Sequence, residues 1–305
     1  MNKHLASAAK WAWGACVLVA IAAVLWRSRA DILLMLEQVP VWMLAASFLC
    51  TMAAKFLLGE NARIAARKSG IILDYPTATK LYNLSQLGKY IPGSVWQFVG
   101  RAAAYRNLGA GYGAIRDSLM TESLWVVMGS AVIGLMLCGR TIVGVIQRSL
   151  PSLVLWWFLG GFVVVSMLLL ALLFLKREAL LRYLMSAVPT PRAILVQCGI
   201  WLLLGLAFWI LAYACGMQAG IGFAIGLFAI SYAVGFLVPI APAGLGVRDA
   251  VLALGLLPYA SPGEALAVTA VSRLLYLAVE LLLAVVQVPL FRMLDHKRDS
   301  IESSP

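Results

Sequence analysis

The stretch Lys89-Tyr-Ile-Pro-Gly-Ser-Val-Trp-Gln-Phe-Val-Gly-Arg101 lies within a chain of 305 residues that is dominated by long apolar runs. Pro92 and Gly93 interrupt its apolar residues, and a cation stands at each end. A proline inside a helix removes a backbone hydrogen bond, and a helix that spans a bilayer needs about 20 mostly apolar residues. The stretch is therefore too short and too broken to cross a membrane as one helix.

A second stretch of the same kind occupies residues 238–248 and reads Val-Pro-Ile-Ala-Pro-Ala-Gly-Leu-Gly-Val-Arg. In both stretches an arginine follows the first proline by nine positions, so that Arg101 corresponds to Arg248. Two matched, broken and cationic segments indicate a repeated element. We expect its hinges and close approaches at the prolines and glycines, namely Pro92, Gly93, Pro239, Pro242, Gly244 and Gly246.

The composition places both stretches in a membrane protein. Hydrophobic residues make up 63% of the chain and charged residues 12%, and the mean hydropathy is +0.92. These values predict a polytopic, all-α membrane protein. A net charge of +11 would suggest nucleic acid in a soluble protein, but here the cations cluster in loops beside apolar spans. We interpret them as topology signals and contacts to anionic lipid, and expect no nucleic-acid partner.

The apolar runs predict one integral membrane domain over residues 1–305, with about six transmembrane helices and two re-entrant helical hairpins. The full spans are predicted at Trp11–Trp26, Val41–Leu58, Ser118–Cys138, Ser152–Leu175, Ala193–Cys215 and Glu264–Leu290. The hairpins are predicted at residues 77–108 and 221–257. Residues 292–305 are expected to form a short polar tail.

The loop charges favour this topology, because cytoplasmic loops of membrane proteins are rich in lysine and arginine. With a cytoplasmic N-terminus and non-crossing hairpins, the cytoplasmic segments hold Lys3, Lys10, Arg63, Arg67, Lys68, Arg106, Arg116, Lys176, Arg177, Arg182, Arg192, Arg292, Lys297 and Arg298. The outer segments hold only Arg27, Arg29, Arg140 and Arg148. We therefore predict a multi-pass protein of a bacterial inner membrane with both termini in the cytoplasm.

Three predicted spans separate the two hairpins. Because this number is odd, the hairpins would enter the membrane from opposite faces. Such an inverted pair is typical of transporters that have a substrate site near the bilayer midplane and work by alternating access. Opposite charges, Glu122 and Arg273, also occupy roughly corresponding places after the two hairpins.

Ionisable residues inside the apolar segments are the candidates for function, since each charge near the bilayer centre costs about 2.5–3.5 kcal/mol. Four cations are predicted to bind an anionic substrate, namely Lys89, Arg101, Arg248 and Arg273. Broken helices would add backbone amides and positive dipole ends, which favour phosphate or carboxylate. Three carboxylates are predicted to couple transport or to form ion pairs, namely Glu122, Asp249 and Glu280.

Structural interpretations of the same residues stand beside the functional ones. Lys89 can mark the cytoplasmic end of a half-helix, with its ammonium group extended to water. Arg248 and Asp249 are adjacent and can form a local pair, while Glu122 and Arg273 can form a bridge that joins the two halves.

Signatures of an enzyme are missing from the apolar body of the sequence. The histidines, His4 and His296, lie in the terminal segments, and the cysteines show no C-x-x-C spacing. No phosphate-binding glycine loop appears between a predicted strand and a helix. We therefore predict that the protein is not an enzyme and binds neither a metal nor a cofactor.

Tyr82-Asn83-Leu84 with Lys89–Arg101, followed later by Pro-Ile-Ala-Pro-Ala-Gly-Leu-Gly-Val-Arg at 239–248, resemble the two signature loops of a known family. This is the lysylphosphatidylglycerol synthase transmembrane region, a flippase-like integral membrane family. The resemblance implies a helical domain with paired re-entrant elements that translocates or accommodates anionic lipids. It assigns family positions to Asn83, Pro92, Gly93, Gly100, Arg101, Glu122, Pro239, Pro242, Gly244, Gly246, Arg248 and Arg273.

The chain departs from the family pattern in its second loop. It has Pro242-Ala243-Gly244 where the family often has Pro-Gly-Gly, and Arg248 stands before Asp249 where an acidic residue often follows the glycines. These changes alter the local charge and thus the headgroup preference. The aminoacyl-transferase domain of the lipid synthases has no counterpart in these motifs, so the resemblance does not imply that activity.

These observations predict a transporter that moves an anionic lipid or a polyprenyl-phosphate-linked lipid across the inner membrane. The alternative is a non-transporting scaffold or accessory subunit that binds enzymes of envelope biosynthesis. An intramembrane transferase that uses Glu122 or Asp249 as a base is a third hypothesis.

Overall fold

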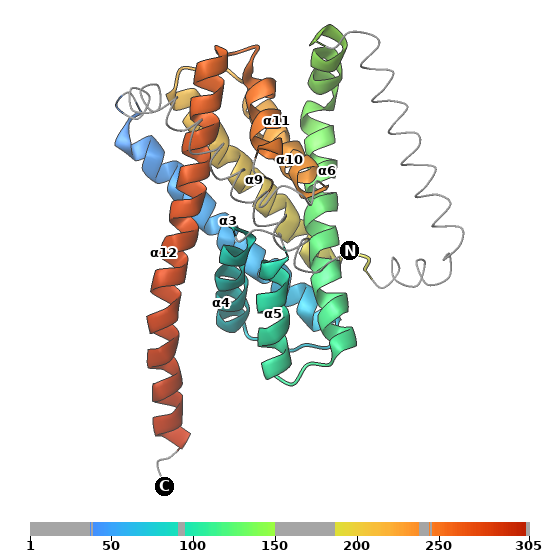
Figure 1. Cartoon of the computed structure of the whole chain (residues 1–305), viewed down its shortest axis with the longest axis vertical. Helices are drawn as coiled ribbons and strands as arrows, with labels where there is room; N and C mark the ends of the chain where they lie inside the picture. The colour runs from blue at the N-terminus through green and yellow to red at the C-terminus, as the bar shows by residue number, and fades with distance from the viewer. Residues whose placement is uncertain are drawn as a thin grey trace, which may run out of the picture.

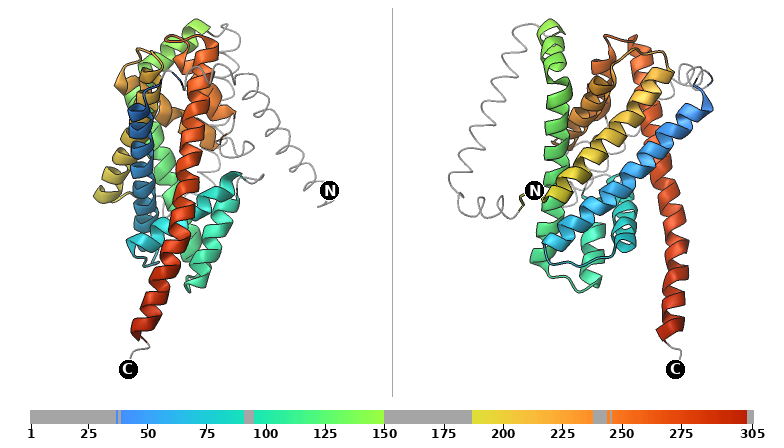
Figure 2. Two further views of the ribbon diagram at one scale, coloured as in Figure 1. Left: turned by 90° about the vertical axis from the view of Figure 1, so that its left-hand side faces the viewer. Right: turned by 180° about the vertical axis from the view of Figure 1, so that it is seen from behind.

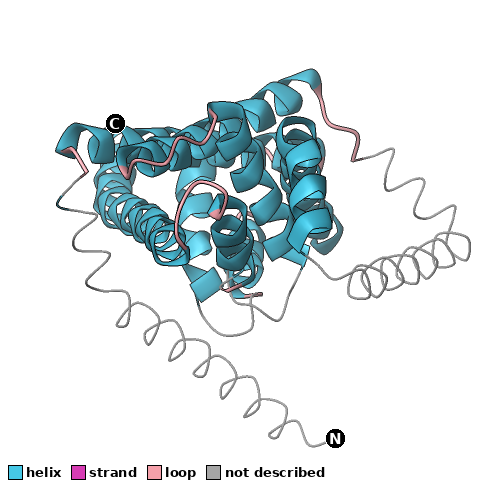
Figure 3. Ribbon diagram, turned by 90° about the horizontal axis from the view of Figure 1, so that it is seen from above, coloured by secondary structure: helices cyan, strands magenta, loops and turns pink. Residues whose placement is uncertain are grey.

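The computed structural model describes residues 39–90, 95–149, 187–237 and 246–302, together with Glu37 and Gly244. Every regular element in these ranges is a helix, and the helices pack into an elongated bundle (Figures 1 and 3). The all-α fold predicted from composition is therefore confirmed for the described part of the chain.

Four helices of the described ranges are long and apolar enough to cross a membrane. They are α3 (Val41–Lys68), α6 (Tyr112–Ser149), α9 (Pro191–Ala214) and α12 (Pro262–Glu302). Each coincides with a predicted span. The predicted spans Trp11–Trp26 and Ser152–Leu175 lie outside the described residues.

Helix α3 continues well beyond Leu58, where the predicted span ended. The polar residues that follow are buried against partners instead of forming a loop. Glu60 accepts a hydrogen bond of 2.7 Å from Arg63 Nε, and Asn61 Oδ1 accepts one of 2.9 Å from Gln197 Nε2 on α9. Partners for Glu60 and for Asn61 Oδ1 thus let the helix continue through this polar segment, although Asn61 Nδ2 has no hydrogen-bond partner among the described residues.

The sequence of helix α12 explains where it begins but did not predict where it ends. Ser261 and Glu264 form a cap at its start: the backbone N–H of Ser261 donates to Glu264 Oε2 at 2.8 Å. Pro262 follows as the first helical residue, where its missing N–H would have no partner. The helix then continues to Glu302, through most of the segment that was expected to be a polar tail.

Shorter elements form two groups. The first comprises α4 (Tyr75–Gln86), the 3-10 helix η1 (Leu87–Tyr90) and α5 (Trp96–Asn107), and the second comprises α10 (Ile221–Leu237) and α11 (Val247–Leu256). In Figure 1 the first group occupies the lower part of the bundle and the second group the upper part. The predicted hinge residues Pro92, Gly93, Pro239 and Pro242 lie outside the described residues.

Two of the predicted hinge glycines have backbones that favour glycine. Gly244 has a φ of 67° and Gly246 a φ of 85°, both in the left-handed region where a Cβ is strained. Gly244 also lies against α10, because a Cβ on it would stand 3.3 Å from Cα of Gly235. Gly246 caps α11, and its N–H donates to Asp249 Oδ2 at 3.0 Å. Gly244 thus allows a close backbone approach to α10, and Gly246 allows the turn into α11.

The described long helices run in both directions along the bundle, and α9 supplies much of the core. In Figure 1 α3 and α12 run downward while α6 and α9 run upward, and the views of Figure 2 show α3 and α9 crossing the bundle obliquely together. On α9 the buried face carries Ile200, Trp201, Leu204 and Phe208. Both groups of short helices pack against α6 and α12, the first group also against α3 and the second also against α9.

Reciprocal glycines bring α6 and α10 close together. A Cβ on Gly134 of α6 would lie 2.8 Å from the backbone N of Ile230 on α10. Conversely, a Cβ on Gly226 of α10 would lie 2.8 Å from Cβ of Leu137 on α6. Small residues of this kind allow close van der Waals packing, which is a main source of helix association in membranes.

Replacing Gly134 with leucine should push α6 away from α10 and lower the free energy of unfolding by about 1–3 kcal/mol, the usual cost of overpacking. The matched control is Gly139→Leu on the same helix, because nothing lies within 4 Å of the Cβ position there. The measurement is the temperature at which half of the detergent-solubilised protein loses its monodisperse size-exclusion peak. Equal shifts for the two variants would show that the contact with α10 is unimportant.

Candidate functional site

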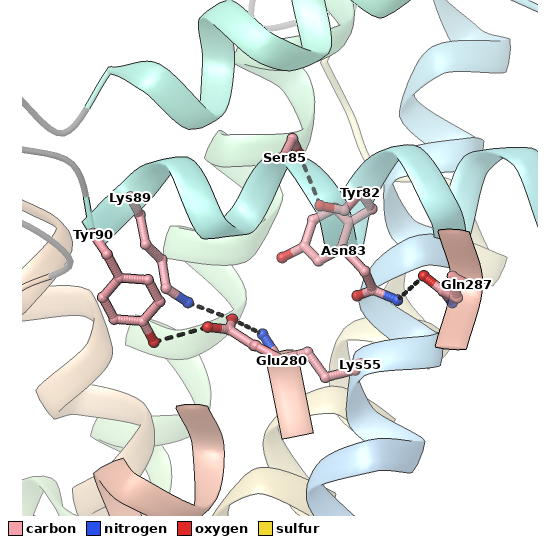
Figure 4. Close-up of polar contacts among 8 residues, drawn as sticks. All are labelled: Lys55, Tyr82, Asn83, Ser85, Lys89, Tyr90, Glu280 and Gln287. Carbon is pink, nitrogen blue, oxygen red and sulfur yellow. Dashed lines mark hydrogen bonds and ion pairs between the residues drawn. The ribbon is translucent and has the colours of Figure 1, made fainter. Parts of the chain in front are cut away.

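The carboxylate of Glu280 on α12 is the centre of a buried network (Figure 4). Its Oε1 accepts hydrogen bonds from Lys55 Nζ of α3 and, at 2.5 Å, from Lys89 Nζ of η1. Its Oε2 accepts a hydrogen bond of 2.8 Å from the hydroxyl of Tyr90, also on η1. One carboxylate therefore joins two long helices to the first group of short helices.

The network lies deep inside the protein. The side chain of Lys55 is fully buried, and that of Glu280 is 1% exposed. Lys55 lies about 20 Å from the start of α3, at a helical rise of about 1.5 Å per residue, and Glu280 lies about 27 Å from the start of α12. Because the predicted span ended at Leu58, Lys55 looked like a residue at the helix end, and its importance was missed.

Three cations lie near a single aromatic ring beside this carboxylate. The ring centroid of Tyr276 lies 4.0 Å from Lys55 Nζ, 4.8 Å from Lys89 Nζ and 5.7 Å from Arg248 Cζ. Tyr276 precedes Glu280 by one helical turn on the same face of α12. The negative face of an aromatic ring attracts cations. Elements from both groups of short helices, η1 and α11, thus meet at one residue.

Arg248 differs from the other buried cations in its surroundings. Its guanidinium Cζ lies 4.4 Å from the ring centroid of Phe228 and 5.4 Å from that of Tyr232, both on α10. The residue is only 9% exposed, yet it forms no ion pair or hydrogen bond with any residue that the structure describes. Its stem packs on Gly235, where an added Cβ would stand 3.1 Å from Cβ of Arg248. The protein therefore holds a buried guanidinium among three aromatic side chains.

Arg101 of α5 is paired more conventionally. Its Nη1 donates to Glu122 Oε2 on α6, and the two side chains are 1% and 6% exposed. Its Cζ lies 4.8 Å from the ring centroid of Tyr82 on α4. Its Nε is buried without a hydrogen-bond partner within the described ranges.

Asp249 and Arg273 make the corresponding pair in the second half of the chain. Arg273 Nε donates to Asp249 Oδ1 at 2.9 Å, and its Nη2 donates to Oδ2 at 3.1 Å. The two structural interpretations of the sequence are therefore wrong in their partners, because Asp249 pairs with Arg273 instead of Arg248, and Glu122 pairs with Arg101 instead of Arg273. In each half, the helix after the break is joined to the following long helix.

Asn83, a position that the family resemblance marked, ties α4 to α12. Its Nδ2 donates to Gln287 Oε1 at 3.3 Å, and both residues are buried (Figure 4). Its Oδ1 has no partner among the described residues. This contact lies about two helical turns from Glu280 along α12, so the same helix holds the first group of short helices at two places.

The structure brings only some of the predicted substrate-binding residues together. Lys89, which is bonded to Glu280, meets Arg248 at Tyr276, whereas Arg101 pairs with Glu122 and Arg273 with Asp249. Sequence reasoning missed Lys55 and the aromatic partners. A lysine in the middle of an apolar helix was the available signal for Lys55. Within the described ranges no cluster of histidine, cysteine, aspartate or glutamate could hold a metal ion.

Four long apolar helices with charges buried between them define a multi-pass helical membrane protein. A family model described as the lysylphosphatidylglycerol synthase TM region matches residues 6–284. The chain therefore belongs to this family, as its two broken segments indicated. None of the curated proteins matches the chain.

Replacing Glu280 with glutamine should destabilise the protein by about 3–5 kcal/mol, because two buried ammonium groups lose their counter-charge. Adding Lys55→Met to Glu280→Gln should recover part of this loss, since one of the two uncompensated cations is then removed. Thermal unfolding of the solubilised protein, followed by size exclusion, measures both effects.

The control for this change is Asp117→Asn in the exposed pair of Arg116 and Asp117, in which Arg116 is 69% exposed. Exposed pairs contribute little, about 0–1 kcal/mol, so the control should unfold like the wild type. A double variant that is less stable than Glu280→Gln alone would contradict the assignment of Lys55 as a partner of this carboxylate.

Proposed function

We propose that this protein moves an anionic or phosphate-linked lipid across a bacterial inner membrane, with the lipid headgroup held at Arg248, Lys89 and Lys55. The observation that carries the proposal is the buried guanidinium of Arg248, which has aromatic neighbours and no carboxylate partner within the described residues. A buried charge without a counter-charge is costly, and such residues usually bind a ligand or take part in a mechanism. The acyl or prenyl chains would stay in the bilayer.

The arrangement of the short helices supports alternating access as the mechanism. The group of α4, η1 and α5 and the group of α10 and α11 lie toward opposite ends of the bundle (Figure 1). We propose that they are re-entrant hairpins, inserted from opposite faces of the membrane between six full spans. Inverted repeats of this kind allow one site to be exposed to either face in turn.

The two ion pairs at corresponding places support the repeat. Arg101 of α5 pairs with Glu122 of α6, and Asp249 of α11 pairs with Arg273 of α12, so the signs of the charges are exchanged between the halves. In this proposal each pair fixes a hairpin to its neighbouring long helix. The protein acts as a transporter and not as an enzyme, and both termini lie in the cytoplasm.

Substituting Arg248 with glutamine should slow lipid movement at least about tenfold, because a hydrogen bond to a charged group is worth about 1.5–3 kcal/mol. The assay follows fluorescent phosphatidylglycerol and fluorescent phosphatidic acid in proteoliposomes, with a membrane-impermeant quencher that reports headgroup exposure. The matched control is Arg116→Gln. Arg116 lies on α6, is 69% exposed and pairs with Asp117 instead of Glu280. Both variants are reconstituted at the same protein-to-lipid ratio.

An unchanged rate in Arg248→Gln would place the headgroup site elsewhere. A wild-type protein that moves neither lipid would contradict transport and favour the scaffold alternative, in which the charges serve assembly with envelope-biosynthesis enzymes. Loss of movement in Arg116→Gln as well would show that any change of surface charge disturbs the assay.

A further inference from the structure

The charges around Tyr276 do not balance. Lys55, Lys89 and Arg248 all approach its ring, and the carboxylate in this neighbourhood is that of Glu280, which pairs with both lysines. Among the residues that the structure describes, three cations against one carboxylate leave an excess of two positive charges. Aromatic rings attract cations but carry no net charge, so they do not remove this excess.

The nearby ion pairs leave the excess unchanged. Asp249 and Arg273 neutralise one another, as do Arg101 and Glu122. Each carboxylate of these two pairs is engaged by its own arginine, so neither is available to the cations at Tyr276. A low-dielectric interior penalises uncompensated charge strongly, and the penalty is relieved by an anion of matching charge.

Phosphate esters of lipids fall into two classes by charge. A phosphodiester headgroup such as that of phosphatidylglycerol carries one negative charge on its phosphate, whereas a terminal phosphate monoester carries about −1.5 to −2 at pH 7. The planar guanidinium of Arg248 suits two oxygens of one phosphate, and the lysines supply point charges. Resting on the proposed function, we infer that the site is built for a terminal, dianionic phosphate monoester in preference to a phosphodiester.

Competition between two lipids with identical acyl chains tests this preference. The purified full-length protein is incubated in micelles that contain equal amounts of phosphatidic acid and phosphatidylglycerol, and the retained lipids are quantified by mass spectrometry after size exclusion. At pH 8 the wild type should retain several-fold more phosphatidic acid. At pH 5, where the monoester has lost its second charge, the two lipids should be retained about equally.

Variants link the preference to the site. Arg248→Gln should abolish the excess of phosphatidic acid at pH 8, while Arg116→Gln, an exposed arginine outside the network, should keep it. Millimolar inorganic phosphate distinguishes the source of the phosphate: it should fail to displace the lipid if the membrane supplies the ligand, and should displace it if a free phosphate is the ligand. Equal retention at pH 8, or a preference that persists in Arg248→Gln, would overturn the inference.

The outcome separates this inference from the proposed function. If fluorescent phosphatidylglycerol and phosphatidic acid move at equal rates and are retained equally, transport stands and the preference for monoesters is wrong. If phosphatidic acid is retained selectively through Arg248 but neither lipid moves, the ligand class stands and transport is wrong.

Discussion

The shared carboxylate of Glu280 is the interaction on which the rest of the described structure depends. It lies between Lys55 of α3 and Lys89 of η1, and it is almost completely buried. An unpaired charge at this depth costs several kcal/mol, so the Glu280 carboxylate depends on its two lysine partners. The contacts of this carboxylate therefore help to set the mutual positions of α3, α12 and the first group of short helices.

The same principle fixes the two groups of short helices at their far sides. Arg101 with Glu122 holds α5 on α6, and Asp249 with Arg273 holds α11 on α12. The side chains of the first pair are 1% and 6% exposed, whereas those of the second are 20% and 24% exposed. Because burial strengthens an ion pair's dependence on its partner, the pair of Arg101 and Glu122 depends more strongly on both of its members than the pair of Asp249 and Arg273.

The sequence predicts the helical class and the four described spans well, because apolar length is a strong local signal. It also places Arg101 and Arg248 inside apolar segments, and both side chains are buried in the structure. The sequence does not predict the ion pairs. Which carboxylate contacts which cation depends on how helices that are far apart in the chain are rotated against one another. Lys55 was missed for a related reason, since the span was predicted to end at Leu58, only three residues after it.

A carboxylate with two lysine partners has a property that a single ion pair lacks. If Lys89 leaves Glu280 to bind an arriving phosphate, the carboxylate keeps Lys55 and is not left as an unpaired buried charge. Arg101 could not leave Glu122 in the same way, because no other cation is bonded to that carboxylate in the described ranges. In the proposed transport cycle, η1 is thus the element that can exchange one anionic partner for another while the long helices stay joined through Lys55.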